Sequence, residues 1–324
     1  MNKLRVAVLG AGSFGGNHIR ALREIPEIEL AGVFDTDAQR AAQHNIRAFS
    51  SIDEIAGAAG CAIVATPTVT HEQVASRLLE AGLDVLVEKP IADSSAAGDR
   101  LTRLAEERGR ILQIGHLERF NPAITALEQA LTLPLFFEVH RLSVFTPRSL
   151  DIDVVLDLMI HDLDIVLSFT REMPVEIRAA GISVLSPLVD IANVRLAFAS
   201  GCIANLTASR VSTEKVRKLR LFQPGEYISV DYQRQEAIRL AIRKNEPKEG
   251  VPPIGFDSLK TAPGEPLKLE LQSFFDAVRE RSQPKVNGIQ ATNALRVAEA
   301  ILAKIKEHAD LVAETVRRSR HFVR

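Results

Sequence analysis

The sequence predicts an α/β protein in which a parallel-sheet domain precedes a second α/β domain with a large mixed or antiparallel open sheet. Its 324 residues exceed the usual size of a single hydrophobic core. The first ~115 residues alternate short apolar runs with amphipathic helical stretches, the pattern of parallel strands and crossover helices. Strand-like segments then follow one another. We therefore expect a boundary between domains 1–116 and 117–324.

The first domain is expected to contain six strands. Near-continuous apolar runs such as VAVL and AIVA suit a sheet that is covered on both faces. The predicted strands are 4–9, 29–34, 47–50, 61–65, 84–87 and 111–114. Amphipathic periodicity predicts the helices 14–25, 71–81 and 94–108.

The second domain is expected to be half exposed, because residues 218–221 alternate apolar and basic side chains. The predicted strands are 135–145, 175–184, 189–198, 202–211, 218–222 and 227–231. The predicted helices are 152–169, 267–281 and 291–308. Five prolines and three glycines in 245–266 predict a long loop.

Composition excludes several classes of partner. The formal net charge is −1, from 40 basic and 41 acidic residues, which gives no electrostatic reason to expect nucleic acid or a membrane surface. The two cysteines, Cys61 and Cys202, are too few for a disulfide framework or a thiolate metal site. No apolar run reaches the ~20 residues of a membrane span. We expect a soluble, cytoplasmic protein.

A glycine motif follows the first predicted strand. Gly10 permits a tight turn, Gly12 lets the backbone approach a pyrophosphate, and Gly15 allows close packing of helix on sheet. The next helix offers unpaired N–H groups to phosphates. We expect a Rossmann domain that binds NAD(P), the alternative being a glycine-rich turn without a ligand. The loop residues expected at the cofactor are Gly10, Gly12, Ser13, Phe14 and Gly15.

Asp35 ends the second predicted strand, where this fingerprint places an acid that binds the ribose. A carboxylate there accepts hydrogen bonds from a free 2′-hydroxyl and repels a 2′-phosphate. We therefore expect NAD rather than NADP, although Arg40 on the following segment could reach round to a phosphate.

Two further motifs sharpen the interpretation. Thr66-Pro67 precedes His71, and Glu88-Lys89-Pro90 follows the strand at 84–87. With the glycine loop and the later Asp157-x-x-x-His161, these motifs resemble the glucose–fructose oxidoreductase/inositol dehydrogenase (Gfo/Idh/MocA) family over nearly the whole chain. The resemblance implies a dehydrogenase that acts on a sugar CH–OH group. It also implies cofactor contacts from Thr66, Pro67, His71, Glu88 and Lys89, and a catalytic trio of Lys89, Asp157 and His161.

Within that family, residues 115–122 and 157–162 resemble the enzymes that oxidise the 3-hydroxyl of a UDP-linked N-acetylhexosamine to a ketone. This resemblance implies a role in 3-amino-sugar and lipopolysaccharide biosynthesis. A same-family enzyme for a UDP-sugar uronate, inositol or a free sugar is the alternative. An NAD-binding sensor without turnover is a second alternative, from another functional class.

Lys89 is placed for catalysis by its position at the carboxyl end of a strand, where open α/β sheets bind ligands. An ammonium there could hydrogen-bond the substrate oxygen and lower its pKa. The alternative is an ordinary surface lysine.

The predicted helix 152–169 is apolar on most sides but carries a polar stripe. Asp153, Asp157, His161 and Asp164 recur at helical spacing and are expected on one face. We expect His161 to act as the base, with Asp157 orienting it or binding a neighbouring hydroxyl. A satisfied polar seam is the alternative. A metal would need a third ligand from His116 or Glu118, and we expect none.

Arg119 and Asn121 stand at the start of the second domain. Arginine suits bidentate phosphate contacts, so both are candidate substrate-binding residues, with a structural ion pair at the hinge as the alternative. The half-exposed sheet has a face to cover, which predicts a homodimer or homotetramer.

Overall fold

The computed structural model describes residues 3–146, 152–242 and 254–319, with side chains to residue 311. The chain divides into two compact units. The first comprises the chain up to Phe120 together with Gly264–Leu295. The second comprises Asn121–Pro263 and the chain from Arg296 onwards. The structure thus groups Gly264–Leu295 with the N-terminal segment, whereas the sequence analysis placed this segment in the second domain.

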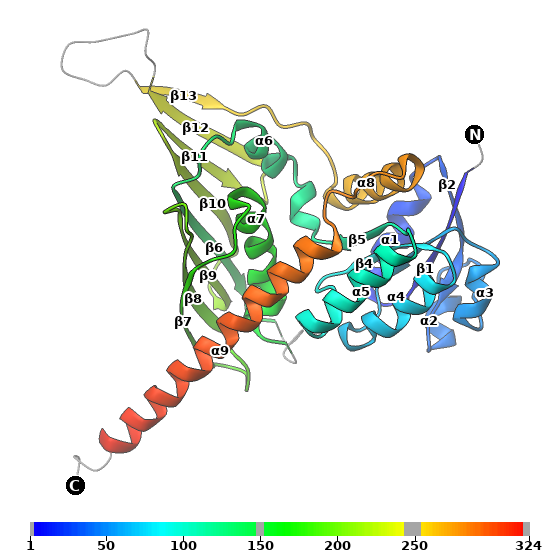
Figure 1. The fold of residues 1–324 in the computed structure, drawn as a ribbon, viewed down its shortest axis with the longest axis horizontal. Coiled ribbons are helices and arrows are strands. Elements are labelled where there is room, and N and C mark those ends of the chain that lie inside the picture. Colours follow the sequence, from blue (N-terminus) through cyan, green and yellow to red (C-terminus); the bar gives the residue numbers. More distant parts are fainter. Residues whose placement is uncertain (1–2, 147–151, 243–253, 320–324) are drawn as a thin grey trace. The chain divides into compact units, whose positions relative to one another are not determined.

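The first unit is built on a five-stranded parallel sheet with the order β2-β1-β3-β4-β5 (Figure 1). Its strands are β1 Leu4–Leu9, β2 Ile28–Phe34, β3 Cys61–Val64, β4 Asp84–Glu88 and β5 Leu112–Gly115. Its helices are α1 Ser13–Arg23, α2 Ala38–Ala42, α3 Ile52–Ala56, α4 His71–Glu80, α5 Ser95–Glu107 and α8 Pro266–Glu280, with short 3-10 turns η1 Thr68–Thr70 and η2 Leu117–Phe120.

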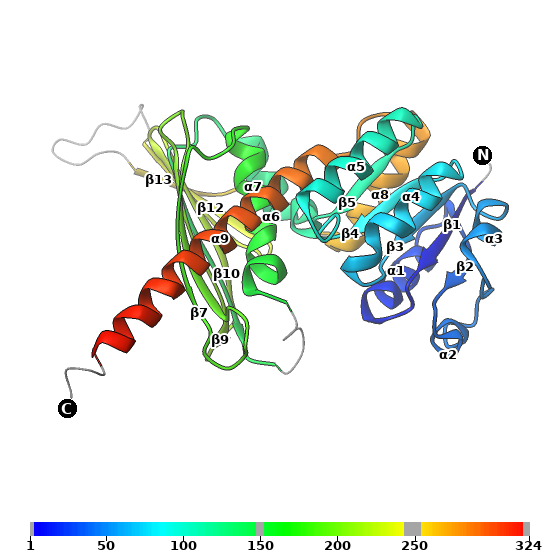
Figure 2. The same cartoon turned by 60° about the horizontal axis from the view of Figure 1, so that its bottom comes forward.

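Helices cover both faces of this sheet (Figure 2). On one face, the apolar side of α1 and of α8 packs on alternate strand residues in a single buried cluster that includes Val8, Leu86, Ile19 and Phe274. α4 packs on β3 and β4 and against α5. This burial explains why the strands are apolar almost throughout. It also explains why α8, late in the sequence, belongs to the first unit.

The second unit contains an eight-stranded sheet with the order β13-β12-β11-β10-β6-β9-β8-β7. The strands are β6 Phe136–Val144, β7 Glu176–Ile182, β8 Ile191–Ala197, β9 Ile203–Ser212, β10 Val216–Gln223, β11 Glu226–Asp231, β12 Glu236–Ile242 and β13 Ile254–Ser258. Among these strands β6 and β9 pair in parallel and the other neighbours are antiparallel. The predicted combination of a parallel Rossmann sheet and a large mixed sheet is confirmed.

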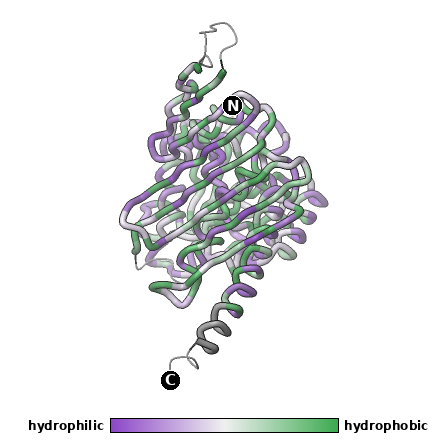
Figure 3. The backbone as a smooth tube through the Cα atoms, turned by 90° about the vertical axis from the view of Figure 1, so that its left-hand side faces the viewer, coloured by the Kyte–Doolittle hydropathy of each residue, from purple (hydrophilic) through white to green (hydrophobic). Residues whose placement is uncertain are grey.

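One face of the eight-stranded sheet is buried. Phe137, Val139 and Leu221 are at most 1% exposed, and residues between them are partly exposed. Figure 3 shows this alternation of hydrophobic and hydrophilic residues along the strands. The helices of the unit are α6 Pro122–Ala130, α7 Ile160–Thr170 and the later part of α9 Gly288–Ser319. No helix in the described ranges is long and apolar enough to cross a membrane.

Three predictions of local structure were wrong, and some elements were not predicted. Residues 47–50 are not a strand, because only Ala48 forms a bridge, with Val33. The predicted helix 152–169 begins instead with a π-helical turn, Val155–Met159, before α7. The predicted loop 245–266 contains the edge strand β13; its residues 245–253 lie outside the described ranges. The helix α6 and the strand β12 were not predicted.

Candidate functional site

A pocket of about 620 Å³ opens at the carboxyl ends of β1, β2 and β3. The order of the strands reverses beside β1, which is where open α/β sheets bind nucleotides. The pocket lining comes from the glycine loop, the end of β2, the Thr66-Pro67 turn and α4. The lining residues used below are Gly10, Gly12, Ser13, Phe14, Asp35, Arg40, Thr66, Pro67, Gln73 and Arg77.

The three glycines of the motif are required for different reasons. Gly10 has φ +93°, and a Cβ there would lie 2.4 Å from the Ala65 carbonyl oxygen. A Cβ on Gly15 would lie 1.8 Å from the Gly10 oxygen. Both positions therefore need glycine for the fold itself. A Cβ on Gly12 would meet nothing within 4 Å. Packing within the protein does not explain this glycine, whereas a phosphate approaching the backbone would.

α1 offers its amino terminus to the same space. Gly12 is its N-cap residue and provides no side-chain hydrogen bond to the first turn. The first N–H groups of a helix have no partner within the helix and attract anions. The open Gly12 backbone and this uncapped helix end fit the pyrophosphate of a dinucleotide.

Asp35 connects the glycine loop to the end of β2. Its Oδ2 accepts a hydrogen bond from the Ala11 N–H at 2.6 Å, and its Oδ1 accepts one from the Asp37 N–H at 2.8 Å. The carboxylate is therefore held in one orientation at the rim of the pocket. Each oxygen retains a further lone pair, as a ribose hydroxyl requires. Arg40 lines the same pocket and lies 3.3 Å from the Asp37 carboxylate.

His71 is buried behind this lining instead of forming part of it. The side chain is 1% exposed, and its two ring nitrogens lie 2.9 Å from the Pro90 and Thr66 carbonyl oxygens. Burial lowers the pKa of His71, although both carbonyls and the charge of Glu88 oppose this shift. The His71 side chain thus connects the Thr66-Pro67 turn to the Glu88-Lys89-Pro90 turn.

Glu88 is held by a histidine from α1. The His18 Nε2 lies 2.6 Å from Glu88 Oε1, with His18 1% exposed and the Glu88 side chain 16% exposed. Burial alone would raise the pKa of Glu88. The His18 hydrogen bond and the charges of His18, Lys89 and His71 outweigh burial and lower this pKa. The structure thus makes His18 the partner of Glu88.

In the second unit, Asp157 and His161 occupy the π-helical turn and the first turn of α7. Both side chains are partly exposed. The prediction that Asp153, Asp157, His161 and Asp164 share one helix face was wrong for the first and the last of these residues. Asp153 Oδ1 accepts a hydrogen bond from the Val189 N–H at 3.0 Å, and Asp164 is 1% exposed. The wider π-helical turn changes which residues share a face.

The residue after His161 anchors α7 to the sheet. Asp162 accepts hydrogen bonds from Arg141 Nε at 2.6 Å and Arg141 Nη2 at 2.9 Å, and the Tyr232 hydroxyl lies 3.1 Å from its Oδ1. All three side chains are buried. The sequence analysis did not single out Asp162 or Arg141. The available sequence signal was an acid directly after the candidate base, in a segment that is apolar on most sides.

The two candidate substrate residues near the boundary are buried. Arg119 is 4% exposed and Asn121 is 2% exposed. Asn121 caps α6, since its Oδ1 accepts from the Ala123 N–H at 3.1 Å, and its Nδ2 donates to the Tyr232 carbonyl at 3.0 Å. The structure therefore gives the Asn121 side chain a role in the fold of the second unit.

Sequence reasoning also missed the part of α4 that lines the pocket. Thr70, Gln73, Val74 and Arg77 recur at i, i+3, i+4 and i+7, and all four line it. This helical periodicity directly after the Thr66-Pro67 turn could have identified them. Among the described residues no group of three or more His, Cys, Asp or Glu side chains could hold a metal ion.

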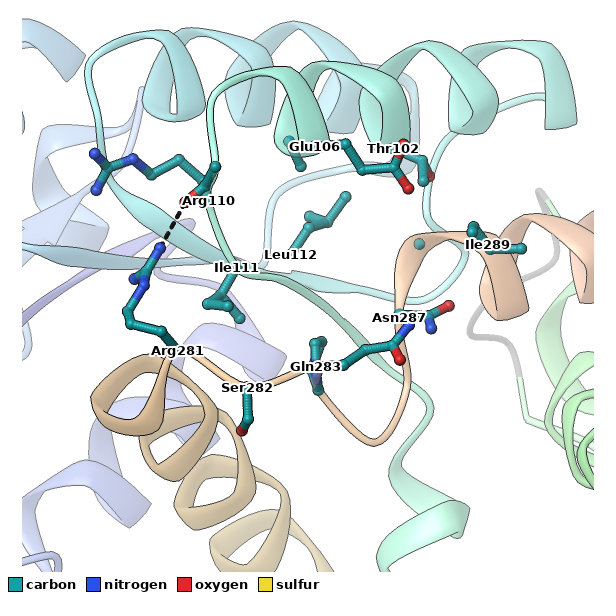
Figure 4. A pocket seen from close by; sticks show the side chains of 14 residues that line it. Thr102, Glu106, Arg110, Ile111, Leu112, Arg281, Ser282, Gln283, Asn287 and Ile289 are labelled. Carbon is teal, nitrogen blue, oxygen red and sulfur yellow. Dashed lines mark hydrogen bonds between the residues drawn. The ribbon is translucent and has the colours of Figure 1, made fainter.

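A second pocket of about 400 Å³ lies at the other edge of the first unit, near the start of β5 (Figure 4). Arg281 there donates to the Gly109 carbonyl at 2.6 Å and to Asp84 Oδ2 at 2.7 Å. These bonds connect α8 to the sheet and the loop before β5. They give Arg281 a structural role, and we assign no ligand to this pocket.

Comparison with known proteins agrees with this geometry. Residues 4–116 match the family described as "Oxidoreductase family, NAD-binding Rossmann fold", and residues 138–223 match the "GFO/IDH/MocA C-terminal domain". UDP-N-acetylglucosamine 3-dehydrogenase from Acidithiobacillus ferrooxidans is 36% identical over 303 residues, which cover 92% of this chain and 96% of the relative.

Solved structures show the same fold. A structure of that A. ferrooxidans enzyme superposes with a TM-score of 0.89 at 35% identity, covering 95% of this chain and 99% of the other. A structure of GenD2 from gentamicin A biosynthesis in complex with NAD has a TM-score of 0.78 at 21% identity, covering 94% and 95%.

Proposed function

The chain belongs to the Gfo/Idh/MocA family of oxidoreductases, and from this premise we propose that it oxidises the 3-hydroxyl of UDP-N-acetylglucosamine to a ketone with NAD. The similarity to a UDP-N-acetylglucosamine 3-dehydrogenase over 92% of the chain is the observation that carries this proposal. A 3-keto sugar is the substrate that an aminotransferase needs to form a 3-amino sugar, so we place the reaction before such a step.

The proposed cofactor is NAD, supported by Asp35 at the rim of the pocket. When bound, the dinucleotide supplies the hydride acceptor. The glycine loop and the uncapped end of α1 would hold its pyrophosphate, and Asp35 would bind a ribose. The Thr66-Pro67 turn would contact the part of the dinucleotide next to them. The carboxylate of Asp35 disfavours the extra phosphate of NADP.

The chain's own residues would manage the proton of the substrate hydroxyl. Lys89 follows β4 at the carboxyl edge of the sheet, where its ammonium would hydrogen-bond the reacting oxygen and stabilise negative charge on it. His161, partly exposed on α7, would take the proton at a ring nitrogen. Asp157, one turn earlier, would orient His161 or bind a neighbouring hydroxyl.

Formation of NADH tests the proposal. Purified protein is mixed with NAD and one candidate sugar, together with an aminotransferase and amino donor that remove the ketone, and NADH absorbance is followed. We expect a signal with UDP-N-acetylglucosamine and none with its uronate or inositol. A signal with another of these sugars alone would keep the chemistry but contradict the substrate. Tight NAD binding with no signal from any sugar would favour a sensor.

We also propose self-association through the open face of the eight-stranded sheet. Phe256, Leu240, Tyr227, Phe222 and Phe136 are paired neighbours across five strands. Phe256 is 64% exposed and Phe222 is 38% exposed. Such an apolar row is typical of surfaces that pair with another chain. Sedimentation that shows only monomer at micromolar concentration would contradict this proposal.

A further inference from the structure

A group of buried polar side chains lies in the apolar layer between the sheet of the first unit and the helices α1 and α8. His18, Gln113 and Glu270 are at most 1% exposed, and Glu88 is mostly buried. The apolar residues of this layer include Leu86, Leu271 and Phe274. A layer of this kind is normally apolar, because buried polar groups need partners.

Short distances join His18 to Glu88 and Gln113 to the backbone of Glu270. His18 lies 2.6 Å from one Glu88 oxygen, and the other Glu88 oxygen lies 3.1 Å from where a Cβ on Gly115 would stand. Gln113 precedes Gly115 by two residues and so shares its face of β5. The Gln113 side chain donates to the backbone carbonyl of Glu270 at 3.1 Å.

Glu270 is the exceptional member of this group. Neither of its carboxyl oxygens has a hydrogen-bond partner among the residues that the structure describes. A bare carboxylate in such a place costs far more than a neutral acid. Burial, and then the charge of Glu88, raise the pKa of Glu270 well above its usual range, whereas the pKa of Glu88 is lowered. A carboxyl group that is 1% exposed and has no hydrogen-bond partner among the described residues is more stable protonated than ionised.

Other titratable groups lie on the elements packed against α8. η2 carries Glu118 and Arg119, β5 is followed by His116, and α1 carries His18. Glu88, at the end of β4, is the charged group that opposes ionisation of Glu270. Lys89 is the next residue, and its charge acts on Glu88.

We propose that Glu270 is a positioning residue that stays a neutral carboxylic acid and so limits the negative charge behind Lys89 to the single carboxylate of Glu88. This inference rests on the proposed function for the role of Lys89 in turnover. A second carboxylate in the layer would attract the Lys89 ammonium toward the interior and away from a substrate oxygen. The neutral acid adds no such attraction.

The pH dependence of unfolding tests where the proton resides, without any substrate. Above the unfolded pKa of about 4.3, unfolding releases the Glu270 proton, so rising pH favours the unfolded wild type. We compare the unfolding equilibrium constants of the wild type and Glu270→Gln. Their ratio, wild type over variant, should rise about tenfold per pH unit between the pKa of Glu270 in the unfolded chain and its pKa in the folded protein. The control Glu280→Gln removes an exposed carboxylate from the same helix and should not reproduce this slope. A wild-type to Glu270→Gln ratio that is flat between about pH 5 and pH 8 would overturn the proposal.

The pH profile of kcat tests the positioning role. Glu270→Gln is permanently neutral, so kcat at neutral pH should stay within about twofold of wild type, and the alkaline limb should move to higher pH. If the alkaline limb of the kcat profile were the same in Glu270→Gln and the wild type, Glu270 would have no positioning role. If the wild type oxidises no sugar, the proposed function fails, while the unfolding experiment still decides whether Glu270 holds the proton.

Discussion

Arg141 and Asp162 form a two-point ion pair inside the second unit, with Nε–Oδ2 and Nη2–Oδ1 distances of 2.6 and 2.9 Å. Arg141 belongs to β6 and Asp162 to α7, so the pair fixes this helix on the buried face of the sheet. Asp162 follows His161 directly. The pair therefore determines which way the first turn of α7 faces.

Asp162→Asn should destabilise the second unit strongly, because it leaves the Arg141 charge buried without its countercharge. Loss of one partner of such a pair costs about 3–5 kcal/mol. Denaturant unfolding measures the change. The matched control is Glu176→Gln, which breaks the exposed pair with Arg178 and should change stability little. Equal effects of both variants would contradict the assignment.

Gly12→Ala should weaken dinucleotide binding at least about tenfold while leaving thermal stability near that of the wild type, because its Cβ enters open space within the protein. Gly15→Ala is the comparison, since its Cβ would overlap the Gly10 carbonyl and should lower the melting temperature. NADH fluorescence titration and thermal melting separate the two effects. Loss of stability in Gly12→Ala would remove the argument for a phosphate there.

Asp35→Asn should shift cofactor preference toward NADP. Asparagine keeps one oxygen that can accept from the Ala11 N–H, but its NH2 group cannot accept from the Asp37 N–H, so the change removes the negative charge and one hydrogen bond. We expect the ratio of the Kd values for NADP and NAD to fall about tenfold or more. Glu27→Gln, which removes an exposed carboxylate outside the pocket lining, serves as the control. An unchanged ratio would show that Asp35 does not set the preference.

Lys89→Ala and His161→Ala should each lower kcat by about 10²–10⁴-fold, the usual contribution of a group that handles the reacting proton. Both should bind NAD with an affinity close to that of the wild type. Steady-state rates and NAD titration give the two quantities. If either variant kept most of its activity, that residue would lose its proposed role.

Cys61 and Cys202 should resist thiol reagents at neutral pH until the protein unfolds. Burial raises the pKa of Cys61 to about 12 and that of Cys202 to about 11, so both thiols stay protonated well above neutral pH. At neutral pH, only a very small fraction of either cysteine is therefore in the reactive thiolate form. Colorimetric titration before and after denaturant provides the test. Rapid reaction of either cysteine in the native protein would contradict it.

Several features were predictable because they depend on residues close together in the sequence. The glycine motif, the strand before it and Asp35 lie within one βαβ unit, where turn geometry and strand burial are local. The π-helical turn before His161 was not predictable, since the apolar pattern of 152–169 also fits an α-helix.

What the sequence by itself determined is the fold class, the dinucleotide loop and the identity of the motif residues, because each follows from short-range pattern and residue chemistry. Only the tertiary structure decided that α8 completes the first unit, that Asp162 pairs with Arg141, and that Glu270 lies in the layer of Glu88. These relationships join residues far apart in the chain. Their energies arise from burial and electrostatic pairing, which exist only after the elements pack.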